Sequence, residues 1–164
     1  MVEMKIELKK GHTEEKYSVV VDENDVVFIN LKGGIGGEDC YPLYPVAIYT
    51  DNSSEIKCIE LLWAEESWSR SSIPSPEITG QSVLSITETG EFRMKPGDDL
   101  SFQDDEADVL FDKDTDILLI KIGESKVQKY YKIAEDVIAG VVDDKLLVEL
   151  CFLNFKSHYQ PRKH

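Results

Sequence analysis

Residues 111–122 read F-D-K-D-T-D-I-L-L-I-K-I, and the rest of the chain is interpreted from this stretch. Three aspartates at alternate positions, Asp112, Asp114 and Asp116, precede the apolar run 117–120. Aspartate favours turns because its carboxylate bonds nearby backbone groups. A short apolar run rich in β-branched residues next to such a turn is typical of a buried strand. The stretch therefore predicts an acidic turn that leads into a central strand.

Similar short segments with strand composition recur along the chain, separated by turn residues, and no segment sustains a helical period of 3.6 residues. The expected strands include residues 4–8, 17–21, 26–31, 46–49, 56–63, 82–87, 91–94, 127–133, 137–142 and 145–155. This succession predicts a mostly β protein, or a β-rich α+β protein, built from antiparallel meanders.

The segment 67–80 contains two prolines and five serines, which is typical of a linker. It divides the chain into an N-terminal β unit, residues 1–66, and a C-terminal β unit, residues 81–155. Residues 156–164 form a basic tail that we expect to fray. The division leaves open whether the two units pack as a single domain.

The first half of the chain resembles the second. Residues 25–31 match residues 116–122 in apolar pattern, and Asp51 with residues 59–61 matches Asp143 with residues 148–150. In this alignment Glu60 falls opposite Glu149. Two matching blocks at nearly equal separation favour a duplicated β unit over unrelated strands.

Residues 111–112, 116–122 and 142–150 together resemble the YuzE-like small bacterial domains of unknown function. The resemblance covers about residues 108–155, with a fainter echo at 20–63, and implies a small β meander. The chain departs from the family pattern by lacking glycine in the Asp143 turn and before Val148. The family has no known chemistry, so the resemblance implies no catalytic residue.

Charge is the most unusual property of the composition. The chain of 164 residues carries 32 acidic and 18 basic side chains, a net charge of −14. Such a surface repels phosphate backbones, which disfavours direct nucleic-acid binding. It attracts cationic partners and accelerates their association at low salt. The composition therefore favours a basic protein partner, although solubility alone also explains an acidic surface.

Cys40, Cys58 and Cys151 form no C-x-x-C pair, and the chain contains no apolar run long enough to span a membrane. Free thiols are typical of a reducing compartment, so we expect a cytoplasmic protein without membrane contact. The oligomeric state is left open by the sequence.

Two features indicate an interaction surface. An acidic run stretches from Asp98 to Asp116, and Trp68 lies among serines, a composition that favours an exposed aromatic anchor. Trp63, by contrast, is expected in the core. The predicted partner-binding residues are Asp98, Asp99, Asp104, Asp105, Glu106, Asp108 and Trp68.

We predict no catalytic residue, no cofactor and no metal site. The run 112–116 imitates the start of a calcium loop but has Ile117 and Gly123 where that loop needs glycine and glutamate. Glycines 33–37 lack the spacing of a phosphate-binding loop. The competing enzyme hypothesis requires Glu60 and Glu149 in one cleft as a carboxylate pair.

The sequence therefore predicts a non-catalytic acidic binding protein, such as an immunity protein or an inhibitor of a basic toxin or nuclease. Two alternatives remain at this point. One is a small-ligand-binding protein with a pocket between the repeats. The other is a housekeeping β domain whose charge only keeps it soluble.

Overall fold

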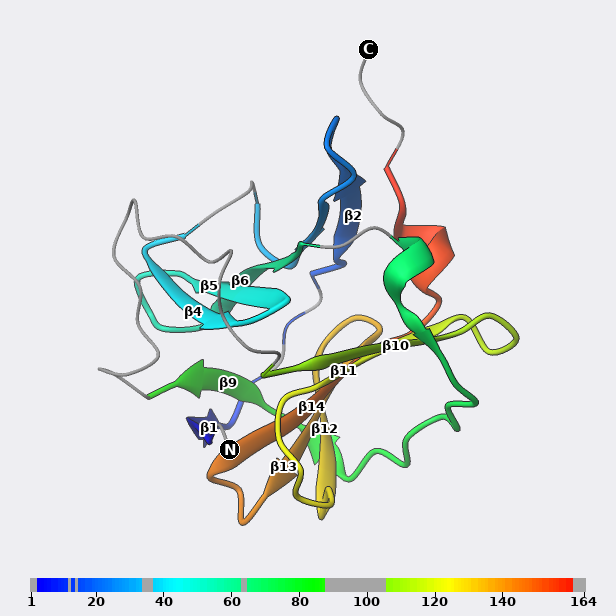
Figure 1. Ribbon diagram of the computed structural model, residues 1–164. Helices are drawn as coiled ribbons and strands as arrows, with labels where there is room; N and C mark the ends of the chain where they lie inside the picture. Colours follow the sequence, from blue (N-terminus) through cyan, green and yellow to red (C-terminus); the bar gives the residue numbers. More distant parts are fainter. Residues whose placement is uncertain are drawn as a thin grey trace.

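The structure is a computed structural model that describes residues 3–11, 13, 15–33, 37–62, 65–87 and 106–160, with only the backbone of Glu66. These residues form 14 strands in two sheets and two short 3-10 helices, with no α-helix among them. The prediction of a mostly β fold is confirmed (Figure 1). Within the described part, no helix is long and apolar enough to cross a membrane.

The first sheet is an antiparallel meander of five strands in the order β2-β3-β6-β5-β4. Most positions of β3 to β6 are buried. The strands are β2 Ser18–Val21, β3 Val27–Asn30, β4 Asp39–Leu43, β5 Val46–Thr50 and β6 Ile56–Leu61.

The second sheet has nine strands and mixed pairing. Its main path runs β7-β10-β11-β14-β13-β12-β8, and β1 pairs with both β14 and β9. The pairs β7–β10 and β8–β12 are parallel, and the others are antiparallel. Its strands are β1 Met4–Lys9, β7 Ser69–Arg70, β8 Gly80–Gln81, β9 Val83–Ile86, β10 Asp108–Asp112, β11 Ile117–Lys121, β12 Lys129–Ala134, β13 Val137–Val142 and β14 Leu146–Phe152.

The acidic turn and the central strand lie where the sequence predicts them. Asp112 ends β10, and β11 starts at Ile117 with four consecutive buried residues. Asp112 Oδ1 accepts hydrogen bonds from the amides of Asp114 at 2.9 Å and Thr115 at 3.3 Å. Asp116 adopts a left-handed conformation with φ 58°, which aspartate tolerates better than most residues.

The two sheets repeat one five-strand unit. The order β2-β3-β6-β5-β4 has the same connectivity as β10-β11-β14-β13-β12. Val27 pairs with Leu61 and Leu118 pairs with Phe152, so both positions differ by 91 (118 − 27 and 152 − 61). The register shift at Tyr49/Thr50 recurs 91 positions later at Gly140/Val141. We call these units repeat 1, β2 to β6, and repeat 2, β10 to β14.

This register corrects the second block of the sequence alignment. Because Leu61 corresponds to Phe152, Glu60 corresponds to Cys151 and not to Glu149. Glu149 in turn corresponds to Cys58. The first block is confirmed, since Asp25 and Asp116 differ by 91 and both adopt left-handed conformations, with φ 62° and 58°.

The ends of the repeats are exchanged. After β6 the chain forms the 3-10 helix η1, Glu65–Ser67, and then adds β7 in parallel to β10 of repeat 2. After β14 it forms η2, Phe155–His158, and Tyr159 then pairs in parallel with Val19 of repeat 1. Figure 1 shows η1 in green beside η2 in red. The chain that leaves each repeat therefore pairs with the edge strand of the other repeat. This exchange relates the two repeats by an approximate twofold axis.

The core joins both sheets. One hydrophobic cluster contains buried residues from β2 to β6 together with residues from β10 to β14. A smaller cluster on the other face of the second sheet is covered by Ile73, from the segment predicted as a linker. That segment, residues 67–80, also contributes β7, so it lies along the second sheet. The predicted domain boundaries themselves stay a prediction.

The expectation of a frayed tail is wrong for residues 156–160. The amide of Lys156 donates to Asp116 Oδ1 at 3.1 Å, and the amide of Gln160 donates to the carbonyl of Val19 at 2.8 Å. Burial of Phe155 and its contacts with other aromatic rings hold this segment in place. Residues 161–164 lie outside the described part.

Candidate functional site

The predicted partner-binding residues fall into two groups. Asp98, Asp99, Asp104 and Asp105 lie outside the described residues, as does Trp63. Glu106 and Asp108 are exposed where the chain enters β10, and Trp68 follows η1. The amides of Glu106 and Ala107 donate to the carbonyl of Tyr44, at 2.7 and 3.2 Å, which fixes this entry against repeat 1.

Trp68 does not lie at the surface as expected. It is only 4% exposed and packs edge-on against Phe111 and Phe155, with ring centroids 6.1 and 5.8 Å apart. The surrounding serines suggested exposure, but two aromatic residues distant in sequence bury the indole. Trp68 therefore cannot serve as an exposed anchor.

The structure nevertheless brings Trp68 and Asp108 to one groove between the repeats. This groove has a volume of about 90 Å³. A typical small-molecule pocket is several times larger, about 300–1,000 Å³. Repeat 1 and its exit contribute Pro45, Leu61, Ser67, Trp68 and Ser69, and the entry to repeat 2 contributes Ala107, Asp108 and Val109. The groove has an apolar floor and a polar rim.

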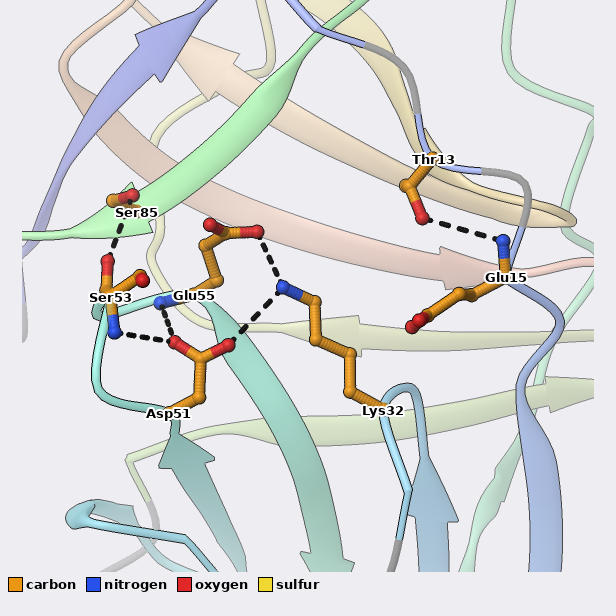
Figure 2. Close-up of polar contacts among 7 residues, drawn as sticks. All are labelled: Thr13, Glu15, Lys32, Asp51, Ser53, Glu55 and Ser85. Atoms are coloured by element: carbon orange, nitrogen blue, oxygen red, sulfur yellow. Dashed lines mark hydrogen bonds and ion pairs between the residues drawn. The ribbon is translucent and has the colours of Figure 1, made fainter.

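A second cavity between the repeats, about 30 Å³, contains a charged cluster (Figure 2). Lys32 Nζ lies 3.2 Å from Asp51 Oδ2 and 2.5 Å from Glu55 Oε1, and Glu15 lines the same cavity. Burial alone would lower the pKa of Lys32, but its hydrogen bonds to Glu55 and Asp51 raise it. The ammonium already occupies the position that a cation would take.

Asp51 is held in this cluster by its own turn. Its Oδ1 accepts from the amides of Ser53 at 2.8 Å and Glu55 at 3.1 Å. Burial would raise the pKa of Asp51, but these amides and the Lys32 ammonium together lower it. The cluster is therefore a satisfied structural network, and nothing in the local sequence around Lys32 signalled it.

The two glutamates of the enzyme hypothesis do not share a cleft. Glu60 Oε2 accepts from the Tyr49 hydroxyl at 2.8 Å, and Glu149 Oε2 accepts from the Tyr130 hydroxyl at 3.2 Å. Each glutamate alternates along its strand with residues of the shared core, such as Leu61 and Leu150. Both therefore face away from that core, on different sheets.

These tyrosines are not poised for proton transfer near neutral pH. Burial, and then the Glu149 carboxylate, raise the pKa of Tyr130 to about 12. Burial and the hydrogen bond to Glu60 raise the pKa of Tyr49 further above its usual value. A phenol donating to a carboxylate holds its proton more tightly, so both pairs are structural.

The cysteines are also unreactive by environment. Burial raises the pKa of Cys40 to about 11 and that of Cys151 to about 12, with Glu60 and Glu149 adding to the respective effects. Cys58 is fully buried. A thiolate is the nucleophilic form, so these thiols are poor nucleophiles at neutral pH.

Asp112 has a structural role in the stretch that imitates a calcium loop. Its Oδ2 accepts from the amide of Ile73 at 2.7 Å, while Oδ1 serves its own turn. The carboxylate therefore ties the segment over the second sheet to β10. Among the described residues, no group of three or more His, Cys, Asp or Glu is arranged to hold a metal.

Replacing Asp112 with asparagine should therefore make stability less dependent on pH. The amide of Ile73 makes the largest contribution to lowering the pKa of Asp112 below 3.8, outweighing desolvation. A lowered folded-state pKa stabilises the protein above the unfolded pKa, and that stability is lost as pH falls through the folded pKa. Urea unfolding should show Asp112→Asn less stable than the native chain at neutral pH, with the gap closing in acid. An equal gap at both pH values would contradict this role.

No family model and no curated protein matches the chain. The resemblance to the YuzE-like domains stays a prediction.

Proposed function

We propose that the protein is a non-catalytic acidic binding protein that captures a basic protein, in the manner of an immunity protein or an inhibitor of a basic toxin or nuclease. The observation that carries the proposal is the net charge of −14, with exposed Glu106 and Asp108 beside a groove between the repeats. A strongly negative surface accelerates encounter with a basic partner and disfavours nucleic acid.

The chemistry of the described side chains supports a binding role over a catalytic one. Cys40, Cys151, Tyr49 and Tyr130 have raised pKa values and retain their protons at neutral pH. The two glutamates lie on different sheets, each paired with a tyrosine. These contacts give the two glutamates and their tyrosines a structural role without a reaction.

The alternative function, a small-ligand-binding protein, is favoured by the position of both cavities between the repeats. Their volumes, about 30 and 90 Å³, argue for something smaller than a metabolite. One of them is already lined by the paired Lys32. A groove of this size suits the end of a partner's side chain better than a separate ligand.

Capture from the native cell at low salt tests the proposal. We expect one basic protein to be recovered stoichiometrically, with an association rate that falls tenfold or more, roughly, as salt is raised to about 1 M. The Glu106→Gln/Asp108→Asn variant should associate more slowly than Glu77→Gln/Glu124→Gln, which removes the same charge from exposed positions elsewhere. Recovery of no basic protein, or an association rate independent of salt, would contradict the proposal.

A further inference from the structure

The groove beside Trp68 has a counterpart on the other side of the approximate twofold. The repeat register relates Ser67 to His158, Ala107 to Tyr17 and Pro45 to Asp136. The remaining apolar positions are also matched, with Leu61 corresponding to Phe152, Trp68 to Tyr159 and Val109 to Val19. The two places are therefore built from the same parts of the fold.

The counterpart is filled by two stacked rings. Tyr17 and His158 have centroids 3.7 Å apart and an interplanar angle of 17°, and Tyr17 meets the ring of Phe152 at 5.4 Å. His158 Nδ1 lies 2.8 Å from the Tyr17 carbonyl, and Nε2 lies 2.9 Å from Asp136 Oδ2. Each ring nitrogen of His158 thus faces an oxygen, one on either side of the ring.

The groove lacks these rings. Serine and alanine replace histidine and tyrosine, and the groove beside them has a volume of about 90 Å³. Its floor retains the apolar surface of Trp68 and Leu61. The groove therefore has room for a planar group where its counterpart has a stacked pair of rings.

The charge around the groove indicates which planar group it takes. The counterpart has an acid at Asp136, and the groove has Pro45 at the equivalent position. The groove instead has an acid at Asp108, where the counterpart has Ser18. Exposed Ser67 and Ser69 add two hydroxyl groups to the rim. An apolar ring would offer the Asp108 carboxylate no hydrogen-bond donor, and an ammonium is not planar. A guanidinium is planar and offers a fork of N–H donors for the carboxylate of Asp108.

We propose that this groove receives the guanidinium group of an arginine on the basic protein partner. The inference rests on the proposed function, since it assigns the chemistry of the partner at that surface. Lys121 lies opposite Asp108 in the β10–β11 pairing, so its ammonium competes with the bound guanidinium for the Asp108 carboxylate. Replacing Lys121 with glutamine should therefore strengthen binding.

The direct test is an NMR titration of the full chain with N-acetyl-L-arginine amide. We expect saturable shifts of the amides of Ser67, Trp68 and Ala107. The citrulline analogue has the same shape without the charge and should bind about tenfold more weakly, a difference of about 1.4 kcal/mol. Asp108→Asn should weaken arginine binding by a similar factor. Asp143→Asn, which removes an exposed acid from another turn, should leave it unchanged.

Filling the groove provides the second arm. Ala107→Tyr restores the ring found in the counterpart and should abolish the shifts, and Ser67→His is a smaller change for use if that variant fails to fold.

Equal binding of arginine and citrulline, unchanged binding by both filled variants, or only ordered water in crystals soaked with the probe would overturn the inference. If a basic protein binds both filled variants as tightly as the native chain, the inference fails while the proposed function stands. If arginine binds but no basic protein is captured, the function fails instead.

Discussion

Replacing Phe155 with alanine is expected to lower the free energy of unfolding by about 3–5 kcal/mol. The side chain is fully buried where the exchanged ends of the two repeats meet. Its ring lies 5.8 Å from Trp68, 6.0 Å from Phe111 and 5.4 Å from Tyr159, all edge-on, and 6.4 Å from Tyr17. Truncation removes contacts with residues of both repeats. It also leaves a cavity, because the surrounding β strands cannot move far enough to fill it.

Thermal and urea unfolding measure this effect. A loss of this size corresponds to a fall in Tm of roughly 6–20 °C for a chain of this length. Ile78→Ala is the matched control, because Ile78 is 46% exposed and its truncation should change stability by no more than about 0.5 kcal/mol. A loss below about 1 kcal/mol for Phe155→Ala would show that the aromatic cluster does not join the repeats.

Replacing Gly140 with tyrosine is expected to destabilise the protein by about 1–3 kcal/mol or more through overpacking. A Cβ at this position would lie 2.8 Å from Val127 Cγ2 and 3.1 Å from Tyr130 Cε1. In repeat 2, Tyr130 on β12 lies opposite Gly140 on β13. The equivalent pair in repeat 1 is reversed, with Cys40 on β4 opposite Tyr49 on β5. Each repeat therefore has one tyrosine in this cross-strand pair, on the first strand of the pair in repeat 2 and on the second in repeat 1.

The double variant Tyr130→Cys/Gly140→Tyr should recover about 1 kcal/mol or more of that loss, because it reproduces the arrangement of repeat 1. Rescue stays partial, since Val127 still has to shift. Tyr130→Cys alone is the control that isolates the coupling between the two positions. Strictly additive losses in a double-mutant cycle would indicate that the two pairs are not equivalent.

The sequence predicted the hairpins well because their signals are local. Asp25 and Asp116 mark left-handed turn positions, and the β-branched runs that follow them form β3 and β11. These features depend on a carboxylate bonding to backbone a few residues away, so no distant part of the chain is needed to recognise them.

The alignment of the second block failed for a physical reason. Side chains alternate with a period of two along a strand, so a shift of two residues leaves the inward and outward faces unchanged. Matching Glu60 with Glu149 therefore preserved the pattern although the true equivalent is Cys151. Only the pairing with neighbouring strands distinguishes the two registers.

By itself the sequence determined the β class of the protein, its acidic turns, its duplicated pattern and its net charge of −14. Tertiary structure alone decided that Trp68 is buried and that it lines a groove with Asp108. It also decided that Tyr17 and His158 fill the counterpart. These outcomes depend on the exchange of edges between the repeats, which brings together residues far apart in the chain. Local propensity and alternation carry no information about such contacts, because both act over only a few residues.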